Sequence, residues 1–218
     1  EKYCRIVANE NGGFETFTTV QDEYPKQWTK SVLTYAVIKG TGDLPSNWQK
    51  QMVSLAMTMW DIEIEVDLKR VSKDNNPDIR IYFKTSDEEK EFKDSPETLA
   101  FAYYPNQGDF SGLLVVNDDY WWNNTGKMDK DNNGNPVQGY NGIAVIGHEM
   151  GHILGLSHSV RNLGKDLLDP YYNNDQFLPS DYDIMRMLKK YPVETDKGFW
   201  HNSRLRSWLR ARILRFRL

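Results

Sequence analysis

The chain of 218 residues has the length of one globular domain with additional segments, and 39% hydrophobic and 13% aromatic residues are enough for a sizeable core. Its apolar runs fall far short of the roughly 20 residues that a transmembrane helix needs, which excludes such a helix. The single cysteine, Cys4, excludes an intrachain disulfide, and the net charge is a modest −4.

The first regular elements follow a polar lead-in, residues 1–22, which is expected to be loosely structured. No secretory signal peptide is visible and residue 1 is Glu, which suggests a processed chain. Apolar and β-branched residues predict four strands, at residues 31–38, 78–83, 98–105 and 112–118. A helix is predicted between the first two, with Ser46 as its N-cap.

Two helices are predicted in the second half. The first begins at Asn141 as N-cap and ends near Gly155, and the second covers residues 179–191, with Lys189 and Lys190 in its last turn. Strands and helices in this order predict an α+β domain with a mixed sheet, covering residues 23–193.

A basic tail, residues 194–218, follows this domain. From Lys197 to Leu218 there are one lysine, six arginines and no acidic residue, so this part carries +7 and the rest of the chain carries −11. Apolar residues are interleaved with the arginines, which indicates a membrane-surface or polyanion-binding segment. Docking on the acidic body and disorder stay open as alternatives.

Three of the four histidines lie within "HEMGHILGLSHS". His148 and His152 are one helical turn apart, so both imidazoles can reach one cation. Gly155 permits the left-handed backbone that ends the helix and brings His158 to the same point. Three neutral nitrogens with one open position are typical of catalytic zinc, and Glu149 is placed to take a proton from the zinc-bound water.

The alternative is a buried helix with satisfied histidines. The full pattern H-E-x-x-H-x-x-G-x-x-H fixes five positions, and its chance occurrence in a chain of this size is about 1 in 10⁴. The zinc interpretation is therefore favoured.

This motif resembles that of the metzincin metalloendopeptidases, and the chain around it resembles the matrixin (matrix metalloproteinase) family from about Lys26 to Tyr191. Further likeness lies in "KQWTKSVLTYAVIKGTGDLP", "DIRIYF", "LAFAYYP", "GLLVVNDDYWWN" and "LPSDYDIMRMLKKY". The resemblance implies a twisted, mixed five-stranded sheet with an active-site helix and a C-terminal helix. It also implies endopeptidase activity with one catalytic zinc.

The resemblance implies a substrate site as well. Leu99 and Ala100 match the strand edge that pairs with an extended substrate, which would bind by β-strand addition. The segment "LLDPYY" resembles the one after the third histidine of matrixins, so Pro170, Tyr171 and Tyr172 would wall the S1′ pocket. An ordinary Pro-aromatic turn is the alternative.

The sequence departs from the family beneath the zinc. Leu168 stands where metzincins have a methionine, and leucine can fill the same apolar floor at low cost. The alternative alignment places Met185 there instead.

Two further metal sites of the family look altered. Phe101 and Val115 replace histidine ligands of the second, structural zinc, which is therefore expected to be absent. The acidic cluster at residues 117–119 is only partly kept. A different calcium candidate is the loop with Asp129, Asp131, Asn133 and Asn135, which matches the first half of an EF-hand loop but lacks the bidentate Glu; a solvated loop is the alternative.

Cys4 raises the question of latency, because matrixin zymogens use a propeptide cysteine as a zinc ligand. The surrounding "EKYCRIV" lacks the usual motif, so Cys4 is either a latency thiol or a surface thiol.

The leading hypothesis is a secreted, monomeric zinc endopeptidase that acts on protein or peptide substrates and has no specific nucleic-acid partner. One rival is a pseudo-enzyme that binds without catalysis, against which Glu149 argues. The other is a membrane-acting protein whose effector is the tail.

Overall fold

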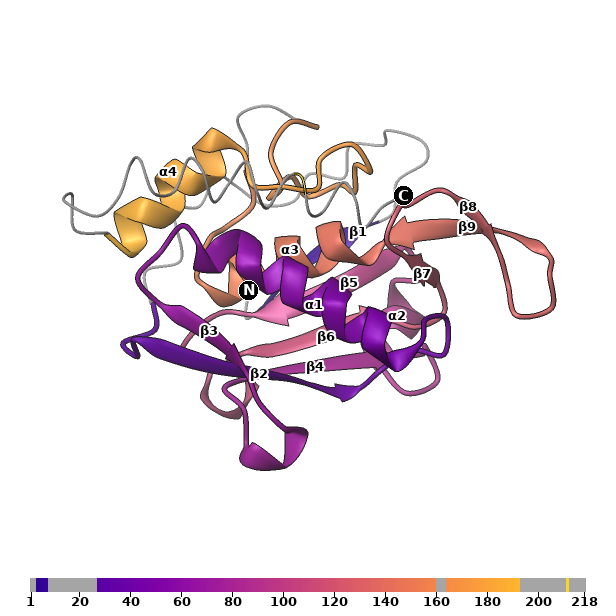
Figure 1. Cartoon of the computed structure of the whole chain (residues 1–218), viewed down its shortest axis with the longest axis horizontal. Coiled ribbons are helices and arrows are strands. Elements are labelled where there is room, and N and C mark those ends of the chain that lie inside the picture. Colours follow the sequence, from indigo (N-terminus) through magenta and orange to yellow (C-terminus); the bar gives the residue numbers. More distant parts are fainter. Residues whose placement is uncertain (1–2, 8–26, 160–163, 193–210, 212–218) are drawn as a thin grey trace.

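The computed structural model describes residues 3–7, 27–159, 164–192 and 211 (Figure 1). Six strands form one mixed sheet, in the order β1-β5-β6-β4-β2-β3. The pairs β2–β3, β2–β4 and β4–β6 are parallel, whereas β5–β6 and β1–β5 are antiparallel. The strands are β1 (Tyr3–Val7), β2 (Val32–Lys39), β3 (Asp67–Arg70), β4 (Ile79–Lys84), β5 (Thr98–Tyr103) and β6 (Leu113–Asn117). The mixed α+β fold class is thus confirmed.

Smaller elements complete the described chain. A second sheet has the order β7-β9-β8, from β7 (Trp121–Asn123), β8 (Met128–Lys130) and β9 (Pro136–Asn141). The helices are α1 (Ser46–Asp61), α2 (Lys90–Asp94), α3 (Gly142–Ile153) and α4 (Asp181–Lys190), with 3-10 turns at Lys73–Asn75 and Gly108–Phe110. No helix in the described ranges is long and apolar enough to cross a membrane.

Three expectations about local structure need correction. The lead-in is not loosely structured throughout, because Tyr3–Val7 adds a sixth strand to the expected five. The unpaired backbone groups of an edge strand, here β5, readily accept such an addition. Ser46 is the first residue of α1 rather than its cap, since Pro45 holds the N-cap position without a side-chain hydrogen bond. The predicted loop with Asp129 and Asp131 belongs to the β8–β9 hairpin.

The helices α1 and α3 lie side by side on one face of the large sheet (Figure 1). They approach closely at glycines: a Cβ added at Gly142 would lie 2.3 Å from the Met52 sulfur, and one at Gly147 would lie 2.6 Å from the Met59 sulfur. The Trp60 indole N–H donates to the Gly147 carbonyl across the same interface at 2.8 Å. The core therefore fixes the position of α3, which carries the histidine motif.

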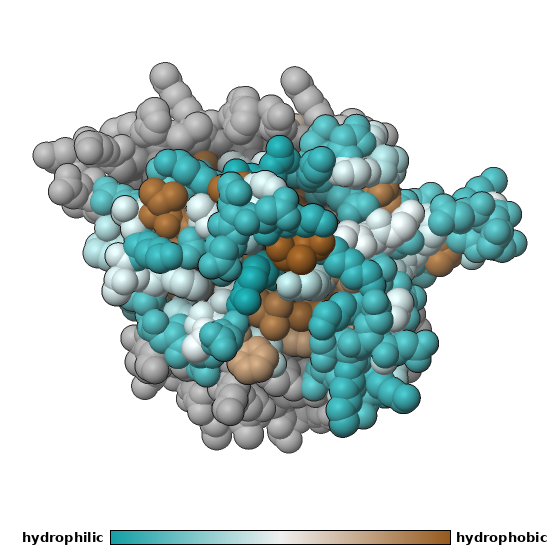
Figure 2. All heavy atoms as spheres, turned by 90° about the horizontal axis from the view of Figure 1, so that it is seen from below, coloured by the Kyte–Doolittle hydropathy of each residue, from teal (hydrophilic) through white to brown (hydrophobic). Residues whose placement is uncertain are grey.

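The opposite face of β5 and β6 carries a smaller apolar cluster. Phe92 of α2 packs there with Phe101 and Val115, and all three side chains are buried. The molecular face seen from below is mostly hydrophilic, with hydrophobic residues gathered near its centre (Figure 2). Phe101 and Val115, which stand at the positions expected for structural-zinc ligands, therefore belong to an apolar cluster.

Candidate metal centre

The histidine motif lies on α3 and the turn that follows it. The Asn141 side chain caps α3 by accepting the backbone N–H groups of Ile143 and Ala144, as predicted. Gly155 has φ +97°, and the Leu156 N–H donates to the Gly151 carbonyl at 2.9 Å. This is a Schellman-type helix end, and it turns the chain so that His158 returns to α3.

The three histidines converge. Their candidate ligand atoms all lie within 4.8 Å of one another, and the Nε2 atoms of His148 and His152 are 2.9 Å apart. Nitrogens that share a tetrahedral zinc at about 2.0–2.1 Å are separated by about 3.4 Å, a value between these two distances, so small side-chain adjustments would bring all three onto one ion. Within the described ranges, these are the only three His, Cys, Asp or Glu residues placed to hold a metal together.

Backbone carbonyls orient two of these rings. The Nδ1 of His148 lies 2.6 Å from the Leu167 carbonyl oxygen, and that of His152 lies 2.7 Å from the Leu156 oxygen. Each ring then donates through Nδ1, which leaves the Nε2 lone pair directed at the shared point. Burial lowers the pKa of His148 to about 4, against a raising effect of the Leu167 carbonyl, so this imidazole is neutral at pH 7.

Glu149 provides the second feature of the centre. Its side chain is fully buried, and neither carboxylate oxygen makes a hydrogen bond of good geometry to the described residues. Burial raises the pKa of Glu149 well above its usual value, and the backbone N–H of Ile6, which faces the carboxylate, acts in the opposite direction. Because a carboxylate buried without well-formed hydrogen bonds is costly, Glu149 is placed to interact with a bound group.

The floor of the centre is apolar. Leu168 is fully buried, and its methyl groups would lie 2.9–3.0 Å from a Cβ added at Gly151, between the two histidines of α3. Met185, by contrast, is 45% exposed on α4. Leu168 thus packs against the helix that carries His148 and His152, whereas Met185 faces solvent, and the residue beneath a metal at this site stays a prediction.

A buried network joins this floor to α4. Asp183 is fully buried, accepts the Leu167 N–H at 2.8 Å, and forms a capping box with Ser180 at the start of α4. Burial raises the pKa of Asp183, although the hydrogen bonds that its carboxylate accepts from Ser180 and Leu167 act to lower it. The sequence analysis did not identify Leu167, whose carbonyl orients His148, or Asp183, which holds the Leu167 N–H.

The pattern S-x-x-D before an apolar run indicates a helix N-cap and could have identified Asp183. A main-chain carbonyl such as that of Leu167 has no sequence signal.

The predicted substrate residues lie around α3. Leu99 and Ala100 are buried in β5, where Ala100 pairs with Ile6 of β1. The Tyr172 hydroxyl accepts the Asn141 N–H at 3.0 Å, and its ring lies 5.4 Å from that of Tyr140. The segment 170–172 is therefore attached to the first turn of α3. Tyr104, also missed, places its ring edge-on 5.8 Å from His152.

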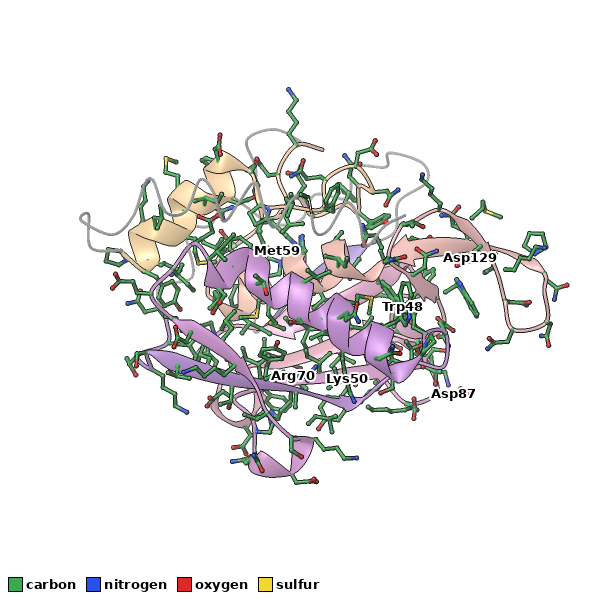
Figure 3. All side chains as sticks on the ribbon, viewed as in Figure 1. Trp48, Lys50, Met59, Arg70, Asp87 and Asp129 are labelled. Carbon is green, nitrogen blue, oxygen red and sulfur yellow. The ribbon has the colours of Figure 1, made fainter. Side chains whose placement is uncertain are left out.

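The remaining predicted site residues are those of the calcium candidate and Cys4. Asp129 lies on the β8–β9 hairpin (Figure 3), where its carboxylate accepts from Trp121 and Asn123. Asp131 instead accepts the backbone N–H groups of Asn133 and Asn135 within the turn. The two carboxylates thus have different partners, and calcium binding stays a prediction. The backbone of Cys4 pairs with Ala102, while its side chain, residues 8–26 and the tail except residue 211 lie outside the described part.

Two imidazoles on a helix that a glycine ends, and a third from the segment after it, converge beside a buried glutamate, which is the arrangement of a metzincin metal centre. The family model for matrixin matches residues 27–191. The chain belongs to the matrixin family.

Several relatives are similar over the same region. Matrilysin of Rattus norvegicus is 32% identical over 170 residues, which cover 76% of this chain and 58% of matrilysin. Stromelysin-1 of Mus musculus is 33% identical over 75% of this chain and 30% of its own length, and karilysin of Tannerella forsythia is 27% identical over 67% and 29%. The chain thus spans less than two thirds of the length of these relatives.

Replacing Leu168 by methionine is expected to change the free energy of unfolding by less than about 1.5 kcal/mol, because the two side chains have similar volumes. Zinc affinity should stay within a few-fold of the wild type. Chemical denaturation and competition with a zinc-binding dye measure the two effects. Met185→Leu, an exposed exchange of the same residue types, is the control. A tenfold or larger loss of zinc affinity in Leu168→Met alone would contradict the interchangeability of leucine and methionine at this position.

Proposed function

We propose that the chain is a zinc-dependent endopeptidase that hydrolyses extended protein substrates, with Glu149 as the general base. One observation carries this proposal: the carboxylate of Glu149 is buried, has no hydrogen bond of good geometry to the described residues, and lies on the helix that supplies two of the three converging histidines. A binding site alone has no need of this carboxylate. Membership of the matrixin family supports the same class of reaction.

The residues of the centre have separate roles. His148, His152 and His158 would hold the zinc, which supplies a Lewis acid when bound and lowers the pKa of its water. Glu149 takes a proton from the attacking water and passes it to the leaving amine. Burial raises the pKa of this carboxyl, which makes it a stronger base than an exposed glutamate.

Substrate recognition is proposed at two elements. The backbone of β5 at Leu99 and Ala100 would pair with an extended peptide, and Pro170, Tyr171 and Tyr172 would wall the pocket for the residue after the cut. The bond from Asn141 to Tyr172 supports this assignment, since it holds the wall against the helix that carries the metal ligands.

One zinc per chain is proposed. The buried apolar surroundings of Phe101 and Val115 support this stoichiometry, because neither side chain offers a ligand atom. We also propose that the protein is secreted and monomeric. Residues 197–218, which lie outside the described part except for residue 211, are proposed to bind a polyanion or a membrane surface.

Removing the metal tests the proposed activity. Elemental analysis first establishes wild-type protein with one zinc per chain, and this protein should hydrolyse casein. It should lose the activity after dialysis against a chelator and recover it when about one equivalent of zinc is added. Magnesium added in place of zinc is the control, because it prefers oxygen ligands. Protein that holds one zinc and leaves casein and a pool of unstructured peptides intact would exclude the endopeptidase and leave a binding protein.

A further inference from the structure

One arginine is buried on the C-terminal helix α4. Arg186 is 6% exposed, and among the side chains that the structure describes no other lysine or arginine is buried. A buried guanidinium is costly unless its N–H groups are paired with acceptors. The partners of Arg186 therefore indicate what this side chain does.

The first partner of Arg186 is the residue before the third histidine. The guanidinium donates to the Ser157 carbonyl oxygen at 2.6 Å and to the Ser157 hydroxyl at 3.1 Å. This carbonyl belongs to the planar peptide unit that joins Ser157 to His158, so the bond restrains the backbone from which the imidazole projects. Hydrogen bonds from a charged donor are about twice as strong as neutral ones. Arg186 thus restrains the direction from which His158 enters the centre.

The residue after His158 is also tied to α4. The Ser159 hydroxyl donates to one oxygen of the Asp166 carboxylate, and the other oxygen accepts the hydroxyl of Ser180, the N-cap of α4. The Ser159 N–H donates to the Leu168 carbonyl at 2.7 Å. Contacts that lead to α4 therefore hold His158 through both of its chain neighbours.

The second partner of Arg186 leads to another histidine. A guanidinium nitrogen lies 3.8 Å from a carboxylate oxygen of Asp183, which is fully buried. Asp183 holds the Leu167 N–H, and the Leu167 carbonyl orients His148. One guanidinium therefore lies where the supports of two of the three histidines meet.

We propose that Arg186 is a positioning residue of the zinc centre, which restrains the backbone at His158 directly and supports His148 through Asp183. It acts without touching the metal or the substrate. This proposal rests on the zinc site of the proposed function and is independent of peptide hydrolysis. Because two ligands depend on one side chain, its loss should weaken zinc binding and change the coordination of the bound ion.

Zinc affinity and the visible absorption of bound Co²⁺, both measured on the full chain, test this role. Arg186→Met keeps a long side chain without the charge and should bind zinc about 10–100-fold more weakly, the usual effect of losing an outer support of a metal ligand. Its Co²⁺ complex should lose the intense absorption of a four-coordinate ion. Arg186→Lys keeps the charge but not the forked donor, so its zinc affinity should lie between that of the wild type and that of Arg186→Met.

Loss of stability is separated from loss of positioning by further variants. Arg186→Met leaves Asp183 buried without its counter-charge, whereas Arg186→Met/Asp183→Asn removes both charges and keeps an acceptor for the Leu167 N–H. The double variant should regain stability and still bind zinc weakly. Phe92→Ala opens a cavity in the cluster on the opposite face of the sheet and should lower stability without changing zinc affinity. Lys189→Met, at an exposed position of α4, should change neither quantity.

The outcomes distinguish this role from the proposed function. A folded double variant with zinc affinity within a few-fold of the wild type and an unchanged Co²⁺ spectrum would overturn the positioning role and leave the endopeptidase proposal intact. An equal loss of zinc affinity in Phe92→Ala would overturn it as well, because stability alone would then explain the effect. Wild type that binds neither zinc nor Co²⁺ would remove the zinc site and the proposed function together.

Discussion

Replacing Glu149 by glutamine is expected to lower kcat/KM for peptide hydrolysis by about 10²–10⁴, the usual contribution of a general acid–base group. Glutamine has nearly the same shape, so the fold should persist, but it cannot accept the proton of the attacking water. Stability should not fall, because the wild-type carboxylate is buried without hydrogen bonds of good geometry to the described residues. Initial rates with a fluorogenic peptide, together with zinc content, measure the effect.

The same exchange at Glu65 is the control, since this residue is exposed just after α1. Glu65→Gln should retain wild-type rates. A Glu149→Gln protein that contains one zinc and hydrolyses the peptide within tenfold of the wild type would show that another group acts as the base.

Replacing Trp60 by alanine is expected to lower the free energy of unfolding by about 3–5 kcal/mol, which corresponds to a Tm lower by about 6–20 °C for a domain of this size. The side chain is fully buried, and its indole donates to the Gly147 carbonyl, one residue before His148. Alanine leaves a cavity between α1 and α3 and removes the hydrogen bond to the Gly147 carbonyl. Denaturation in the presence of excess zinc measures the change in stability.

Trp48 offers a matched control on the same helix. It lies in the first turn of α1 and is 43% exposed (Figure 3). Trp48→Ala should change the free energy of unfolding by no more than about 1 kcal/mol. Equal losses from the two substitutions would contradict the packing of α1 against α3.

Strong local patterns predicted much of the fold. The alternation of Ile79, Ile81 and Phe83 predicted β4, because every second side chain of that strand enters the core. The spacing of His148 and His152 likewise predicted a shared point on α3, which the structure confirms. In these cases the sequence of one element alone determines which face is buried.

The remaining features depend on contacts between distant segments. Tyr3–Val7 lacks a hydrophobic period that marks a strand, and its pairing depends on the free edge that β5 offers. Strand β3 is short and largely exposed, so its sequence carries little apolar pattern. The carbonyls of Leu156 and Leu167 orient the histidines through main-chain atoms, which every residue type possesses. No residue preference reveals such contacts.

The two hydrogen bonds on either side of the Leu167 α-carbon have a thermodynamic consequence. Its carbonyl orients His148, and its N–H is held by Asp183 at the start of α4. Zinc that binds only the folded centre stabilises it by about 2.7 kcal/mol at a free concentration 100 times Kd. By linkage, a substitution that loosens the start of α4 is expected to weaken zinc binding at the histidines, and bound zinc is expected to protect α4 from local unfolding to the same extent. The start of α4 and the candidate metal centre are thus joined through one residue, so zinc bound to the histidines would raise the free energy of local unfolding of both.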